Sequence, residues 1–308
     1  MRHLVRDLAL ALREHVLPSL GSHTARAHDA GAEAAGGDVT FAIDAGAEDR
    51  LEEFVAQRAP GVAFYSEDRG LVMPPGGHPT AVLVVDPIDG TRPALAGLES
   101  CCVSVALAPY EDGQPTMADV SHGCVVEIPS GRVFMAERGR GLIEGPPVRL
   151  SPNESVRRMF WTYGFRGRPA RALTEVLAEL IDASSVGGGT FELGSAAFDS
   201  MCVVDGRLDA YVEPGPRMVA DVPGIREEFE RVGAGAVLNN SPYDLAASVL
   251  ILEEAGAVVT DAYGGLLGGR PLLGSGAEYQ MSIVASGNPA LHEHILLALD
   301  AGIGRLNG

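Results

Sequence analysis

The spacing of apolar residues changes along the chain and separates helical segments from strands. Leu4, Leu8 and Leu12 recur at helical intervals between charged residues, which predicts an amphipathic helix over residues 3–17 ending at Pro18. Similar spacing, with Pro or Gly at the ends, predicts helices over 45–59, 170–182, 194–204, 245–255 and 289–299. Short apolar runs predict strands at 62–65, 81–85, 101–108, 122–128, 132–136, 208–213, 258–260 and 282–286. This order of elements predicts layers of helix and mixed sheet.

The length favours two sub-domains that share a cleft. The chain has 308 residues, of which 46% are hydrophobic, and a single ordinary domain has about 150. We place the boundary near Leu150, which divides the chain into residues 1–150 and 151–308. Residues 21–37 are predicted to be loop with some residual helix. Residues 214–242 are predicted to be a long connection, with an exposed helix at 225–231 or with no order at all.

Charge and cysteine content exclude several classes of protein. Arginine supplies all 23 cations, lysine is absent, and 41 acidic residues give a net charge of −18. Such a balance repels nucleic acid and anionic membranes, and the lack of lysine excludes Schiff-base chemistry and lysine-dependent phosphate loops. Four cysteines without a CxxC pair favour a reduced, cytoplasmic protein. Charges interrupt the first helix, unlike a signal peptide, and no apolar run approaches the ~18 residues of a membrane span.

The segment from Ala81 to Thr91 carries the most informative chemistry. A buried strand delivers Asp86 and Asp89, three residues apart, into a turn shaped by Pro and Gly. Carboxylates and main-chain carbonyls are the ligands that Mg²⁺ prefers, so Asp86, Asp89 and the carbonyl of Ile88 are candidate ligands. The alternative is a tight Asp-Gly turn in which both carboxylates bond only to their own backbone.

Three further carboxylates each allow two interpretations. Glu67 follows a predicted strand and is either a ligand or part of an ordinary acidic loop. Asp244 follows Ser241-Pro242-Tyr243, a pattern typical of a helix N-terminus, so it can cap the helix, bind metal, or do both. Asp44 is a candidate N-cap of the second helix.

Taken in order, the motifs resemble those of the inositol monophosphatase family. They are VTFAID, YSED, DPIDGT, GSAAFDSMCVVDGRLDAYVE and YDLAASVLILEEAG, and they cover most of residues 38–265. The resemblance implies a layered α/β/α/β/α sandwich with mixed, largely antiparallel sheets. It also implies a lithium-sensitive phosphatase that binds two or three Mg²⁺ per subunit, and we expect a cytoplasmic homodimer.

The resemblance also implies a role for each matched residue. Metal ligands are expected at Glu67, Asp86, Ile88, Asp89 and Asp244. Asp44 and Thr91 match the pair that orients the attacking water, and we count Glu67 with them as catalytic. Substrate contacts are expected at Gly90, Thr91, Ser195, Ala196 and Glu213.

Departures from the family pattern fall at the substrate end. Leu83 replaces a frequent tryptophan, Pro93-Ala94 a frequent Asn-Phe, Tyr243 the usual tryptophan before the last ligand, and Asp68 the second glutamate of the family's pair. The 29 residues of 214–242 also exceed the usual connection, and we expect them to govern substrate choice. These changes leave the substrate open.

The expected substrate is a small phosphate ester, with inositol monophosphate first by resemblance. Fructose 1,6-bisphosphate and a phosphorylated nucleoside or specialised metabolite are alternatives, and a catalytically silent binding or regulatory protein is a different class. A bisphosphate needs a further cationic anchor, for which the candidates are Arg92, Arg166, Arg168 and Arg217.

Overall fold

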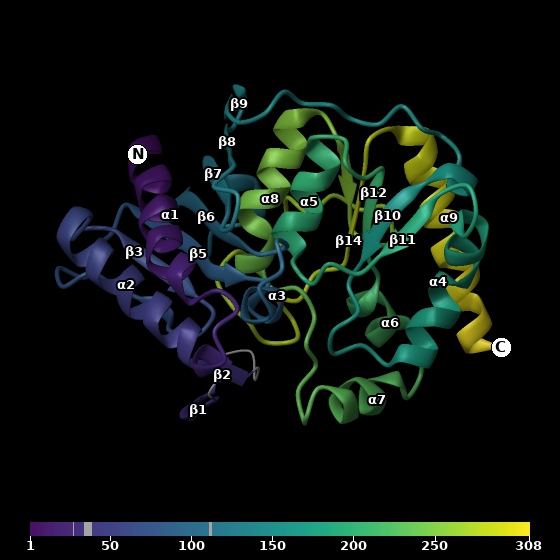
Figure 1. Ribbon diagram of the computed structural model, residues 1–308, viewed down its shortest axis with the longest axis horizontal. Helices are drawn as coiled ribbons and strands as arrows, with labels where there is room; N and C mark the ends of the chain where they lie inside the picture. Colours follow the sequence, from purple (N-terminus) through teal and green to yellow (C-terminus); the bar gives the residue numbers. More distant parts are fainter. Residues whose placement is uncertain (27, 34–38, 111–112) are drawn as a thin grey trace.

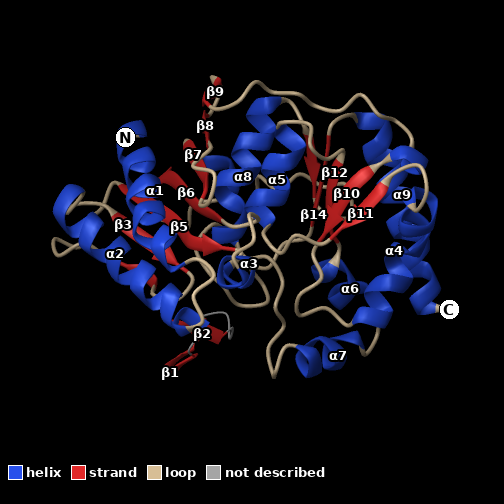
Figure 2. Cartoon of the chain, viewed as in Figure 1, coloured by secondary structure: helices blue, strands red, loops and turns tan. Residues whose placement is uncertain are grey.

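The computed structural model describes residues 1–26, 28–33, 39–110 and 113–308, and its elements form five layers (Figures 1 and 2). Helices α1 and α2 cover one face of a seven-stranded sheet, and α5 and α8 lie between that sheet and a five-stranded one. Helices α4 and α9 cover the far face of the smaller sheet. The predicted α/β/α/β/α sandwich with mixed sheets is confirmed.

The first layer forms because two helices bury one apolar face each. α1 (Arg2–Val16) buries Leu8 and Leu12 completely. α2 (Ala42–Arg58) buries Leu51 and Phe54 against the same sheet. A small hairpin of β1 (His28–Glu33) and β2 (Val39–Phe41) lies at its beginning.

The seven-stranded sheet brings the predicted acidic residues to one edge. Its strands, in the spatial order β4-β3-β5-β6-β7-β8-β9, are antiparallel except for the parallel pair β3–β5. Their bounds are β3 (Ala63–Ser66), β4 (Gly70–Val72), β5 (Ala81–Asp89), β6 (Cys102–Pro109), β7 (His122–Glu127), β8 (Val133–Glu137) and β9 (Gly141–Glu144). Because β3 and β5 run in parallel, Glu67, just after β3, and Asp86, near the end of β5, lie at the same end of these two strands.

The middle layer is apolar on all sides, as expected for helices between two sheets. α8 (Pro242–Ala255) buries every residue from Leu245 to Leu252, and α5 (Ala196–Val204) is buried throughout. The N-termini of both helices lie beside the acidic edge of the larger sheet.

The second half repeats the pattern of sheet and outer helices. The smaller sheet has the order β11-β10-β12-β14-β13, parallel from β11 to β12 and antiparallel beyond. Its strands are β10 (Phe160–Tyr163), β11 (Gly189–Phe191), β12 (Ala210–Glu213), β13 (Val258–Thr260) and β14 (Ile283–Ser286). Helices α4 (Ala170–Ser184) and α9 (Pro289–Asn307) pack on it and on each other. Leu150 lies between the end of β9 and the start of β10. The division of the chain into two sub-domains at this residue stays a prediction.

Several predicted elements differ from the structure in extent or type. α2 begins at Ala42, so Asp44 is inside its first turn, and α9 continues to Asn307. Five strands, β1, β4, β9, β10 and β11, and the short helix α3 (Thr91–Ala96) were not predicted. The prediction of loop over 21–37 is wrong where β1 lies, and residues 27 and 34–38 lie outside the described residues.

The segment 214–242 is folded rather than a bare connection. It contains α6 (Gly215–Asp221) and α7 (Ile225–Val232), drawn at the bottom of Figure 1. Met218 and Phe229 are fully buried in the same apolar cluster as α4 and α9. The expected helix is therefore half-buried, not exposed, and the disordered alternative is wrong. Among the described helices, none has the length and apolar character needed to cross a bilayer.

Candidate active site

A cavity of about 780 Å³ lies where the two halves meet. The predicted site residues reach it from the loop after β3, the end of β5, α3, and the first turns of α5 and α8, and further lining residues come from the segment after β10 and from the end of α7. Of the residues predicted for the site, the cavity is lined by Glu67, Asp86, Ile88, Asp89, Gly90, Thr91, Ser195, Ala196 and Asp244.

Three carboxylates gather at the floor of this cavity. Asp86, Asp89 and Asp244 each offer an oxygen, and these oxygens all lie within 4.8 Å of one another. Residues three apart on a regular strand face opposite sides of the sheet. A register shift between Asp86 and Asp89 places Asp86 opposite Ser104 and Asp89 opposite Cys102, which inserts one extra residue. This bulge brings both carboxylates to the same side.

Each carboxylate is also held by a hydrogen bond from its surroundings. Asp86 accepts from the amide of Ile88 at 2.9 Å, and Asp244 accepts from the amide of Ser241 at 2.6 Å. Asp89 Oδ2 accepts from the Ser195 hydroxyl at 2.8 Å and from the Ala197 amide at 2.5 Å. Asp244 thus completes a capping box at the start of α8 while its carboxylate belongs to the acidic group.

Burial and mutual repulsion disfavour the charged forms of all three groups. Burial and then Asp89, Glu67 and Asp244 raise the pKa of Asp86 well above its usual range. Burial raises the pKa of Asp89 to about 6, against the effect of its hydrogen bonds. Burial and the charge of Asp89 raise the pKa of Asp244 to about 7. A cation bound among these oxygens would offset both the burial of the charged carboxylates and their mutual repulsion.

The donor set fits a hard divalent cation. It consists of carboxylate oxygens, with Glu67 lining the same cavity, and Mg²⁺ prefers oxygen ligands. The four cysteines are buried, and none belongs to this acidic group. The residues therefore suit Mg²⁺ rather than a soft metal.

Thr91 and Asp44 form a pair beside the acidic group. Thr91 Oγ1 lies 3.0 Å from Asp44 Oδ1 and 3.1 Å from the Ile88 carbonyl oxygen, so its one proton can go to either. Asp44 Oδ2 accepts from the amide of Phe41 at 2.9 Å, which makes Phe41 the N-cap of α2 in place of Asp44.

Gly90 is required by its surroundings. Its φ is +89°, and a Cβ there would lie 2.7 Å from the Ser100 carbonyl oxygen and 2.9 Å from Ser195 Cβ. The chain can pass between β6 and α5 only without a side chain at this position.

The residues predicted for the substrate end occupy different places. Ser195 and Ala196 line the cavity, but the Ser195 hydroxyl donates to Asp89 and accepts from the amide of Phe198 as N-cap of α5. Glu213 is fully buried behind the cavity wall and does not line it. Its carboxylate pairs with Arg168 at 2.6 Å and accepts from the amide of Gly215 at 2.7 Å.

The structure adds a buried carboxylate, Asp199, that the sequence analysis did not single out. Asp199 on α5 lines the cavity, is 2% exposed, and has no hydrogen-bond partner for Oδ1 among the described residues. Its position four residues after Ser195 on a helix was the available signal, because such residues share a face.

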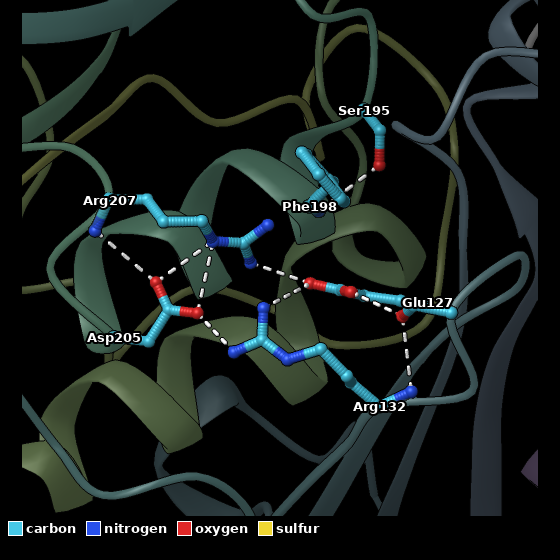
Figure 3. Close-up of polar contacts among 7 residues, drawn as sticks. Glu127, Arg132, Ser195, Phe198, Asp205 and Arg207 are labelled. Carbon is cyan, nitrogen blue, oxygen red and sulfur yellow. Dashed lines mark hydrogen bonds and ion pairs between the residues drawn. The ribbon is translucent and has the colours of Figure 1, made fainter.

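The far end of α5 is fixed by a buried ion-pair network, drawn in Figure 3. Arg207 binds Glu127 at 2.6 Å and Asp205 at 3.0 Å, and Arg132 pairs with the same two carboxylates. The Arg207 guanidinium also lies 4.8 Å from the centre of the Phe198 ring. The network joins the end of α5 to the turn between β7 and β8, and the N-terminus of α5 holds Asp89.

Arg207→Ala is expected to destabilise the fold by about 2 kcal/mol. Removing one partner of a buried pair costs roughly 3–5 kcal/mol, and we reduce this because the Arg207 side chain is 35% exposed. Urea unfolding followed by circular dichroism measures the change. A loss below about 0.5 kcal/mol would mean that Arg132 alone neutralises both carboxylates.

The comparisons with known proteins agree with this arrangement of sheets and helices. The family model for the inositol monophosphatase family matches residues 4–302. A "Fructose-1,6-bisphosphatase/inositol-1-monophosphatase" of Methanothermobacter thermautotrophicus is 31% identical over 274 residues, covering 86% of this chain and 85% of its own. An "Inositol-1-monophosphatase" of Caulobacter vibrioides is 27% identical over 227 residues, covering 72% and 75%. A solved structure, "extragenic suppressor protein suhB from Bartonella henselae", has a TM-score of 0.72 at 21% identity and covers 97% of this chain and 98% of its own.

The layered sandwich, with an acidic group that could hold a metal ion, is the fold and candidate site of a phosphatase family. The chain belongs to the inositol monophosphatase family.

Proposed function

We propose that this protein is a Mg²⁺-dependent phosphomonoesterase that acts on a small phosphorylated polyol or sugar. The observation that carries the proposal is the group of Asp86, Asp89 and Asp244 in the cavity lining. Asp86 and Asp89 are buried, Asp244 is half-buried, and their oxygens lie within 4.8 Å of one another. Phosphate-ester hydrolysis needs charge neutralisation and in-line positioning more than covalent chemistry.

Oxygen atoms of five lining residues would hold the ions. These residues are Glu67, Asp86, Asp89, Asp244 and, through its carbonyl, Ile88. Family resemblance suggests two or three ions. When bound, Mg²⁺ would neutralise the carboxylates and the phosphate and would acidify water.

Thr91 and Asp44 would direct the attack. With its proton donated to Asp44 Oδ1, 3.0 Å away, the Thr91 hydroxyl keeps its lone pairs for a proton of the attacking water. Gly90 and Thr91 line the cavity beside the carboxylates, so their backbone amides are the nearest candidates to bind phosphate oxygens.

Hydroxyl groups of the substrate would meet α5. Asp199 offers an unpartnered oxygen there, and Ala196 lines the same wall. Ser195 acts mainly by holding Asp89, and Glu213 by holding Arg168, so both would affect the substrate indirectly.

Phosphate release tests this proposal directly. The panel contains inositol 1-phosphate, fructose 1,6-bisphosphate and a nucleoside monophosphate, measured with Mg²⁺, with excess chelator, and after Mg²⁺ is restored. We expect activity with Mg²⁺, loss on chelation, recovery on restoration, and inhibition by lithium and calcium. Full turnover in excess chelator would exclude the metal assignment.

A binding or regulatory protein without turnover is the alternative of a different class. The likeness to the suhB structure concerns the fold alone at 21% identity. A silent member should have lost metal-site side chains, whereas this chain keeps every carboxylate of the proposed set. Absence of phosphate release from the whole panel would favour the alternative.

A further inference from the structure

The cavity extends well beyond the acidic group. Its volume of about 780 Å³ lies in the upper part of the ~300–1,000 Å³ typical of small-molecule pockets. The end of α7 and the connection to α8 contribute Val232, Val237 and Leu238 to its lining.

Part of the cavity lining is apolar and exposed. Leu98, Phe165 and Val232, called the apolar wall below, line the cavity and remain 57%, 41% and 39% exposed. They come from three separate segments, after α3, after β10 and at the end of α7. Apolar side chains exposed within a pocket are available to contact a ligand there.

Phe165 is held in place by an aromatic row that begins in the core. Its ring meets Tyr163 edge to face, with centroids 6.4 Å apart and planes at 86°. Tyr163 in turn packs against the fully buried Trp161 at 5.7 Å. A supported ring of this kind offers apolar surface at little entropic cost to a flat group that packs against it.

The charges that line the cavity are of both signs. Arg168 is committed to the buried Glu213 carboxylate, while Arg92 and Arg166 also line the cavity. Glu192 lines the same cavity and would repel an anion. Arg217 lines a different cavity and pairs with Asp221 and Asp300.

We infer that the alcohol part of the substrate carries an uncharged, flat apolar group, which packs on the wall formed by Leu98, Phe165 and Val232. The substrate class is then a phosphate ester of a polyol or sugar that also bears an aryl or similarly flat apolar group. This inference rests on the proposed function, and it deepens that function by assigning the apolar part of the lining to the alcohol.

Two phosphonates that cannot be hydrolysed test the wall without requiring turnover. Benzylphosphonate and methylphosphonate are titrated into the full-length protein with Mg²⁺ by isothermal titration calorimetry. We expect benzylphosphonate to bind at least about tenfold more tightly, as is usual for burying an apolar group in a fitting pocket. Phe165→Ala should reduce this preference to about threefold or less while changing methylphosphonate affinity by less than about twofold. Val232→Ser should also reduce the preference for benzylphosphonate over methylphosphonate.

Phe191→Ala is the matched control. Phe191 is similarly exposed, at 39%, and does not line the cavity, so the preference should persist. Equal affinities for the two phosphonates, no binding of either, or equal effects of Phe165→Ala and Phe191→Ala would overturn the inference.

Phosphate release separates the two proposals. If esters are hydrolysed with Mg²⁺ but the phosphonates show no preference, the apolar wall is refuted and the phosphatase stands. If the phosphonates show the expected preference but no ester is hydrolysed, the wall stands and the phosphatase is refuted.

Discussion

Asp89→Asn is expected to lower kcat/KM for phosphate release by more than about 100-fold, because even groups that only support metal ligands contribute about 10- to 100-fold. Asp89 Oδ2 accepts both the Ser195 hydroxyl and the Ala197 amide. The amide oxygen of asparagine can keep both bonds, and its nitrogen then replaces the other carboxylate oxygen. The substitution therefore removes a charged donor from the acidic group while preserving the contact with α5.

The fold should tolerate this change. Removing one of three crowded carboxylates lessens repulsion, so the melting temperature in chelator should stay equal or rise slightly. Phosphate release, calorimetric Mg²⁺ titration and thermal unfolding together measure the effect. Wild-type turnover with unchanged Mg²⁺ dependence would show that Asp86 and Asp89 only shape a turn.

Asp244→Asn is also expected to lower kcat/KM by more than about 100-fold, with little change in melting temperature. Asp244 Oδ2 accepts from the amide of Ser241, and asparagine caps a helix about as well as aspartate. It is a poorer ligand for Mg²⁺. The variant thus retains the capping function and removes the proposed metal function.

Asp119→Asn is the matched control. Asp119 occupies the same capping-box position in the short 3-10 helix Met117–Asp119, where it accepts from the amide of Thr116 at 2.7 Å. It is exposed and does not line the cavity. Its substitution should leave phosphate release unchanged. Near-normal activity of Asp244→Asn would instead mean that Asp244 serves α8 alone.

Long elements with a clear period were predictable from the sequence. α1 and five strands of the larger sheet, β3, β5, β6, β7 and β8, bury the apolar positions that define their spacing. Short elements depend on partners elsewhere in the chain: β11 has three residues and forms by pairing with β10, and β4 forms by pairing with β3. Local sequence does not contain that information.

The candidate site was predictable to a similar extent. The motifs identified the carboxylates that line the cavity, because turn residues and acidic residues are adjacent in sequence there. The strand bulge that turns Asp86 and Asp89 to one side is a property of pairing with β6. The burial of Glu213 behind Arg168 and the exposure of Phe165 likewise depend on three-dimensional packing.

The acidic group has a further consequence for the stability of the protein. Asp86 and Asp89 belong to β5 of the larger sheet, whereas Asp244 belongs to α8 of the middle layer. An ion bound by all three would join these layers, and without it their carboxylates repel each other across the same junction. By mass action, an ion at 100 times its dissociation constant would add about 2.7 kcal/mol to the free energy of unfolding. The conformational stability of this chain is then a function of the free cation concentration, and a melting temperature has a defined meaning only at a stated value of it.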